Sequence, residues 1–171
     1  MPTTVPAPTP SRIRQKREAT PVRRAERQAA SWLATHSVTA LRISLGLVIL
    51  GFGVLKYVPG ASPAEQLAMR TTDALTFGIV NGQLAVVGTA MVETVIGLIL
   101  LTGRFMKPGM VIMAGWLAGI LAPVVLFPSE MFPEGLPTLA AQYVLKDIIL
   151  VAASMVVAAH VLGARLRVTD R

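Results

Sequence analysis

Four long apolar stretches, separated by polar or proline-rich breaks, constrain the fold of this chain more than any other feature. They run over about 37–57, 83–101, 109–127 and 139–162. A helix needs about 20 predominantly apolar residues to cross the hydrocarbon core of a bilayer, and backbone groups in lipid must be hydrogen-bonded within the segment. The pattern therefore predicts an all-α fold, a polytopic membrane protein with a bundle of four transmembrane helices.

The composition agrees with a membrane protein and excludes several kinds of chemistry. Of the 171 residues, 53% are hydrophobic and 15% are charged, and the mean hydropathy is +0.62. The chain has no cysteine, which excludes disulfides, thiolate-bound metals and cysteine nucleophiles. The sequence also has no metal-binding, phosphate-loop or dinucleotide-binding motif, so we expect no metal site.

The formal net charge of +7 comes from the two ends of the chain. Residues 1–36 hold seven basic and two acidic residues, 164–171 hold three basic residues and one acid, and the intervening stretch is neutral. Nucleic acid is therefore not an expected partner. Four prolines in the first ten residues and few apolar side chains predict a disordered basic arm over 1–36, attracted to anionic lipid headgroups.

The distribution of Lys and Arg among the connections predicts the orientation. The arm, the turn with Arg104 and Lys107, and the basic tail 164–171 hold the excess, whereas 58–82 contain one basic residue and 128–138 contain none. Connections rich in Lys and Arg stay in the cytoplasm. We therefore expect both termini in the cytoplasm, and 58–82 and 128–138 outside.

The outer connections contain features of their own. Residues 63–80 place apolar among charged side chains and predict one or more short helices along the outer interface. Pro123 predicts that the third span kinks or stops there. Pro108 suits the first turn of the same span.

A stripe of small residues recurs along the third span. It consists of Ala114, Gly115, Ala118, Gly119 and Ala122. Small side chains at this spacing let two helices approach closely. We expect the stripe to pack against another helix of the same chain, with a homodimer through the stripe as the alternative.

Charged side chains inside the apolar stretches are the candidate site. Glu93 lies roughly 15 Å into the second span, and Lys146 and Asp147 lie roughly 10 to 12 Å into the fourth, at 1.5 Å per residue. Lys56 closes the outer end of the first span. Because successive spans alternate in direction, all four fall in the outer half of the bilayer, where charged residues usually face the bundle interior.

This neutral set of charges has two interpretations. One is a structural ion-pair network that fixes the helix register. The other is a polar pocket in which a quinone headgroup binds between Glu93 and Lys146, and a carboxylate carries protons. Gln142 shares a helix face with Lys146, and Tyr143 shares one with Asp147, which adds polar groups to the pocket.

An isolated carboxylate near the bilayer midplane would be costly, so we expect Glu93 to pair with Lys56 or Lys146. Depth favours Lys146. The 128–138 loop is expected to close the pocket on the outer side. Two further basic side chains lie near the cytoplasmic ends and are expected to reach lipid phosphates: Arg42 and Arg104.

Three segments carry a resemblance to a known family. They are LRISLGLVILGFGVLKYVPG (41–60), VETVIGLILLTGR (92–104) and QYVLKDIILVAA (142–153). Over 37–163 the chain resembles the DoxX superfamily of small four-helix bacterial membrane proteins, and it is most similar to the YkgB-like branch. The matching positions are Arg42, Gly53, Lys56, Tyr57, Glu93, Gly97, Leu145, Lys146 and Asp147.

The resemblance implies a multi-pass protein of the bacterial plasma (inner) membrane in a redox or oxidative-stress setting. The superfamily is named for a subunit of a thiosulfate:quinone oxidoreductase, so the resemblance implies quinone as a ligand and a redox protein as a partner. Most members have no established reaction. Two classes of function stay open: a redox-associated subunit with a quinone pocket, and a noncatalytic membrane scaffold or stress protein whose buried charges are structural.

Overall fold

The computed structural model describes residues 21–62 and 65–167, and all regular structure within them is helical. The helices are α1 (Pro21–Leu55), α2 (Glu65–Leu75), α3 (Gly82–Thr102), α4 (Met106–Leu126), α5 (Pro128–Met131), the 3-10 helix η1 (Pro133–Gly135), α6 (Leu139–Leu145) and α7 (Ile148–Val161). Among these residues, four helical segments are long and apolar enough to cross a membrane: α1, α3, α4 and the α6–α7 pair. The predicted all-α fold with four candidate transmembrane spans is therefore confirmed.

Local sequence explains where the second and third spans begin and end. Gly103 ends α3 with a left-handed φ of 70°, and its N–H donates to the carbonyl of Ile99 at 2.9 Å. Pro108 lies in the first turn of α4, as expected. Pro123 lies inside α4 and the helix continues to Leu126, so the third span does not stop at this proline. α2 confirms the short helix expected within 63–80.

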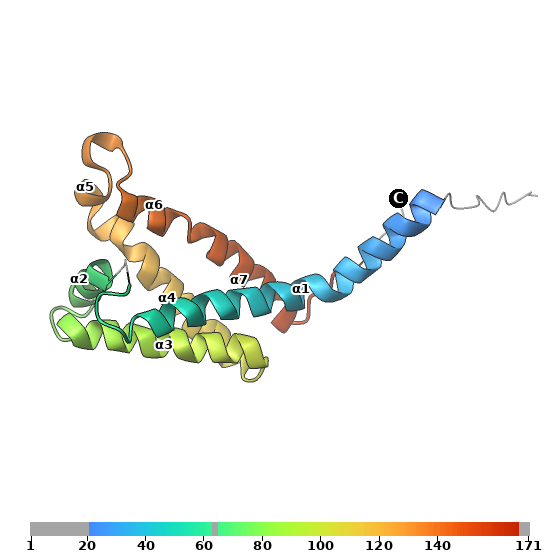
Figure 1. Ribbon diagram of the computed structural model, residues 1–171, viewed down its shortest axis with the longest axis horizontal. Coiled ribbons are helices and arrows are strands. Elements are labelled where there is room, and N and C mark those ends of the chain that lie inside the picture. The colour runs from blue at the N-terminus through green and yellow to red at the C-terminus, as the bar shows by residue number, and fades with distance from the viewer. Residues whose placement is uncertain (1–20, 63–64, 168–171) are drawn as a thin grey trace, which may run out of the picture.

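The first helix is longer than predicted and corrects one expectation. α1 begins at Pro21, so residues 21–36, which were assigned to a disordered arm, are helical. Proline is favoured at the first helical position, and the alanines, the arginines, Glu26 and Gln28 that follow are strong helix formers. Adding them to an existing helix needs no new nucleation. Residues 1–20 of the predicted arm lie outside the described residues. Figure 1 shows the first half of α1 extending beyond the bundle.

The fourth span is interrupted where a continuous helix was expected. α6 ends at Leu145 and α7 begins at Ile148. Between them the N–H of Asp147 donates to the carbonyl of Val144 at 3.0 Å, three residues back rather than four, which is a tightened, 3-10-like turn. Such a break at membrane depth is tolerated where the backbone lines a protein cavity.

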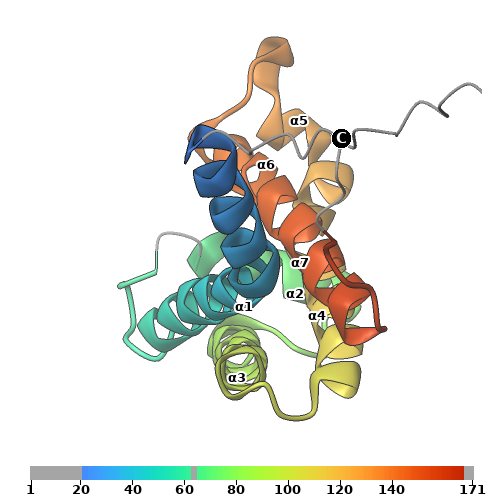
Figure 2. The same ribbon diagram turned by 90° about the vertical axis from the view of Figure 1, so that its right-hand side faces the viewer.

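The spans enclose one apolar core. α1 packs against α3, α3 against α4, α4 against α7, and α7 against α1, so the bundle closes on itself. Figure 2 shows α1 and α3 side by side. The core consists of Leu45, Ile49, Ile96, Leu100, Met113, Leu117 and Val157. Many large apolar side chains remain exposed on the outer surface, as lipid-facing positions require.

Close helix packing uses glycines other than those of the predicted stripe. A Cβ at Gly115 or Gly119 would meet nothing within 4 Å, and Ala114, Gly115 and Ala118 are exposed. The expected packing of the stripe against another helix of the chain is therefore wrong, and Gly119 and Ala122 are only partly buried. The close approaches instead occur at four glycines: Gly46, Gly53, Gly97 and Gly109.

The connections gather at two ends of the bundle, as four spans require. α2 and α5 lie at one end, while the α3–α4 turn and the last turns of α7 lie toward the other, from which α1 projects (Figure 1). Which end faces the cytoplasm stays a prediction from the charge bias.

Thiol labelling in intact cells tests this orientation, because the chain has no native cysteine. Ser129 and Thr102 are both exposed and lie at opposite ends of the bundle. A membrane-impermeant reagent should label Ser129→Cys and leave Thr102→Cys unlabelled until the cells are opened. The reverse pattern would contradict cytoplasmic termini.

Candidate binding cleft

A partly open cleft of about 960 Å³ lies among the helices at the end of the bundle where α2 packs. Helices α1, α2, α3, α4, α6 and α7 all contribute to its lining, which is mostly apolar. The volume falls within the range of roughly 300–1,000 Å³ that is typical of small-molecule sites. Its ionisable and amphipathic side chains are Lys56, Glu93, Trp116, Tyr143, Lys146 and Asp147.

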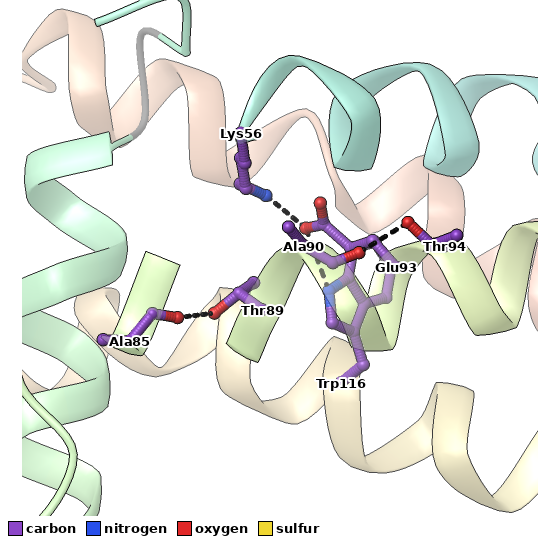
Figure 3. A network of polar contacts seen from close by, with 7 residues as sticks. All are labelled: Lys56, Ala85, Thr89, Ala90, Glu93, Thr94 and Trp116. Carbon is purple, nitrogen blue, oxygen red and sulfur yellow. Dashed lines mark hydrogen bonds and ion pairs between the residues drawn. The ribbon is translucent and has the colours of Figure 1, made fainter. Parts of the chain in front are cut away.

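A buried ion pair lies on the wall of this cleft. The ammonium of Lys56 donates to Oε1 of Glu93, and the Nε1–H of Trp116 donates to the same oxygen at 3.2 Å (Figure 3). Lys56 is 8% exposed and Glu93 is 1% exposed. A buried carboxylate is stable when an opposite charge and further hydrogen bonds compensate its lost hydration. Together with Trp116 the pair connects three spans, because the three residues come from the end of α1, α3 and α4.

Gly53 explains how Lys56 reaches Glu93. A Cβ at Gly53 would lie 2.9 Å from Cβ of Glu93 and 3.3 Å from the backbone nitrogen of Thr94. Only a glycine therefore lets α1 approach α3 this closely. Lys56 follows three residues later on the same side of the chain, so its ammonium enters the bundle at the depth of Glu93. The expected pairing of Glu93 with one of two lysines is realised with Lys56.

The preference for Lys146 as that partner is wrong. Lys146 is exposed, and its ammonium lies 3.4 Å from the ring centroid of Tyr143 and 5.3 Å from that of Phe52. These are cation–π contacts. The tightened turn after α6 places Lys146 and Asp147 at the cleft, where both line it together with Tyr143.

Gln142 is the candidate residue that the structure leaves away from the cleft. It is exposed, and its side-chain amide donates to the carbonyl of Pro137 at 3.2 Å. The Gln142 side chain therefore stabilises the loop before α6 and does not contact a ligand in the cleft. The α-helical hydrogen bond from Lys146 N–H to the carbonyl of Gln142 keeps the expected spacing of the two residues, but only Lys146 lines the cleft.

α2 closes one side of the cleft, and the predicted 128–138 loop does not line it. Leu67, Ala68, Thr71, Thr72 and Leu75 of α2 all contribute to the lining. The loop instead holds α2 in place. Arg70 donates two hydrogen bonds to the Glu130 carboxylate, at 2.6 and 2.8 Å, and its guanidinium lies 5.0 Å from the ring centroid of Phe127.

This link between α2 and α5 should depend on pH. The hydrogen bonds from Arg70 hold the pKa of Glu130 below its ordinary value. The link therefore stabilises the α2 position above the ordinary carboxyl pKa of about 4.3, and it is lost as the pH falls through the lower folded value. Spin labels at Ala74 and Ser129 should give a narrow distance distribution at neutral pH and a broad one in strong acid.

Arg70→Gln is the matched variant for that measurement, because it keeps a polar side chain and removes the guanidinium. Its distance distribution should already be broad at neutral pH. An unchanged distribution in Arg70→Gln would show that apolar packing of α2, and not the ion pair, fixes its position.

The predicted lipid contact of Arg42 is wrong. Its guanidinium donates to the carbonyls of Leu100 and Leu101 and packs against Gly103. These carbonyls belong to the last turn of α3, which lacks intrahelical donors, so Arg42 caps a neighbouring helix. Arg104 is exposed at the α3–α4 turn, and its contact with lipid phosphate stays a prediction.

Trp116 is the member of the site that the sequence prediction missed. Its indole nitrogen is a donor only, and a buried tryptophan usually finds an acceptor. A lone tryptophan within a mostly aliphatic span, at the depth of an acidic residue in another span, was the available signal. Thr71 and Thr89 also line the cleft, but their hydroxyls donate to carbonyls of their own helices, those of Leu67 and Ala85.

The arrangement suits binding of an amphipathic molecule. The cleft offers a large apolar surface and one cluster of charged and aromatic groups. Within the described part of the chain, no three His, Asp or Glu side chains lie close enough together to hold a metal ion. No family model matches the chain, and neither a curated protein nor a solved structure matches it significantly.

Proposed function

We propose that this protein is a DoxX-like integral membrane protein that binds a quinone-type molecule in the cleft and holds it for a redox partner in the same membrane. The observation that carries the proposal is the buried Lys56–Glu93–Trp116 cluster on the wall of a large apolar cleft. A quinone has a polar headgroup on an apolar body, and the cleft has both kinds of surface side by side.

Two further observations support this function. The cleft volume of about 960 Å³ is large enough for a headgroup and part of a chain. Charged residues within spans that line a cavity generally mark ligand or proton pathways. The identity of the ligand as a quinone and the redox partner are taken from the resemblance to the DoxX superfamily.

A noncatalytic scaffold is the second candidate, and one observation favours it. The ion pair and Trp116 connect α1, α3 and α4, so the cluster fixes the positions of three spans whether or not a ligand binds. On this alternative, the cleft would bind no quinone, and replacing the charges would change stability alone.

Tryptophan fluorescence separates the two candidates, because the chain has only two tryptophans. Trp116 lines the cleft, and Trp32 lies on the projecting half of α1 and is 60% exposed. In a Trp32→Phe variant reconstituted in nanodiscs, a short-chain benzoquinone should quench Trp116 saturably. In Trp116→Phe, quenching of Trp32 should rise linearly with concentration. Linear quenching in both variants would favour the scaffold.

A further inference from the structure

The carboxylate of Glu93 uses only one of its two oxygens. Oε1 accepts hydrogen bonds from both Lys56 and Trp116. Oε2 is fully buried and has no hydrogen-bond partner among the described residues. Figure 3 shows this second oxygen directed away from Trp116. A buried, unpaired oxygen of a charged group is costly, so this position favours any molecule that can donate a hydrogen bond to it.

Other polar groups around the cleft point to the same chemistry. Oε1 of Glu93 already uses the single N–H donor of Trp116 and one of the three N–H donors of the Lys56 ammonium. The hydroxyls of Thr71 and Thr89 donate along their own helices, which leaves their oxygen lone pairs as acceptors. Asp147 adds a second carboxylate to the lining.

The remaining donors and hydroxyls do not reverse this preference, because the Lys56 ammonium is already held against the Glu93 carboxylate. Lys146 lies over two aromatic rings at the exposed edge. Ser62, Thr72 and Tyr143 also line the cleft, and a hydroxyl can either donate or accept. Glu93 is more deeply buried than Lys56, so the deepest ionisable group of the cleft lining has an unpartnered oxygen that acts as an acceptor.

We propose that the cleft selects a ligand whose polar head donates a hydrogen bond to Oε2 of Glu93, and therefore binds the hydroquinone form in preference to the quinone. A hydroquinone carries two O–H donors, whereas a quinone carries only acceptor carbonyls. This inference rests on the proposed function, because it names which form of the quinone-type ligand the cleft takes. A quinone carbonyl would face the Glu93 carboxylate with no proton between the two oxygens.

Three ligands of matched shape test the preference: a short-chain benzoquinone, its hydroquinone and the dimethyl ether of that hydroquinone. Binding is measured in the Trp32→Phe protein under anaerobic conditions, by direct quenching for the benzoquinone and by competition for the other two. The hydroquinone should bind at least about tenfold more tightly than the benzoquinone. This factor corresponds to the lower end of the range of energies for a hydrogen bond to a charged group. The ether has no donor and should lose this advantage.

Glu93→Gln supplies the matched variant, since its amide can turn a donor toward the ligand. The preference for hydroquinone should disappear in it, whereas Glu26→Gln, on the exposed, projecting half of α1, should keep the preference. The comparison of three ligands in the Trp32→Phe protein does not depend on how well either variant folds. Benzoquinone binding as tightly as hydroquinone would overturn this inference and leave the proposed function standing. Failure of all three ligands to bind saturably would overturn both.

Discussion

Lys56→Met should lower the free energy of unfolding by about 3–5 kcal/mol, the usual cost of removing one partner of a buried ion pair. The variant leaves the Glu93 carboxylate buried with Trp116 as its remaining donor, because Glu93 is 1% exposed. Adding Glu93→Gln should recover a large part of the loss, since the double variant has no unpaired buried charge. Unfolding in mixed detergent micelles, followed by circular dichroism, measures all three proteins.

Lys146→Met is the control for this cycle. Lys146 is exposed and contacts aromatic rings rather than a carboxylate, so its loss should cost about 0.5–1 kcal/mol, the value for an exposed cation–π contact. Additive losses from Lys56→Met and Glu93→Gln would contradict the pairing. A larger loss of stability in Lys146→Met than in Lys56→Met would show that Lys146, the partner predicted from depth, pairs with Glu93.

Gly97→Ala should destabilise the bundle by about 1–3 kcal/mol, the typical cost of overpacking a close contact. A Cβ at this position would lie 2.7 Å from Cβ of Leu50 and 3.0 Å from its backbone nitrogen and Cα. The backbone of α1 cannot give way as a side-chain tip could, so α1 and α3 must separate. The separation would also withdraw Lys56 from Glu93, and the variant should bind ligand more weakly.

Gly88→Ala provides the comparison on the same helix. A Cβ at Gly88 would meet nothing within 4 Å, so the variant should gain up to about 1 kcal/mol from the better helix propensity of alanine. The two glycine variants should therefore shift the unfolding transition in opposite directions. A gain of stability in Gly97→Ala would show that α1 and α3 are not held together at this contact.

The spans were predictable because each needs only an apolar run of sufficient length, and α3 and α4 begin and end close to the expected residues. Their contacts were less predictable. Periodicity identifies a small-residue stripe on α4, but it does not identify which helix meets it, and Gly115 faces open space. The glycines that do pack, Gly46 and Gly53, are seven residues apart on α1, a spacing that also places residues on one helix face.

The charged residues of the site were predictable from the sequence, but the partner of Glu93 was not. An intramembrane Glu93 requires compensation, but depth favoured Lys146 because it treats every helix as straight and continuous. The tightened turn at Asp147 and the close approach at Gly53 depend on tertiary packing. The same limit applies to Arg42, whose position near a span end does not reveal that α3 ends beside it.

The unbroken course of α1 has a mechanical consequence. Its 35 residues make a helix about 52 Å long at 1.5 Å per residue, whereas the hydrocarbon core is about 30 Å thick. Arg42 is fixed at the end of α3, and Arg23 lies about 29 Å farther along the helix by the same rise. In an upright helix, that distance exceeds about 8 Å, the length over which salt screens the interaction between two charges at physiological ionic strength. The basic end then lies in the aqueous phase, away from the charges at the membrane surface, and a tilt of the span would move it sideways.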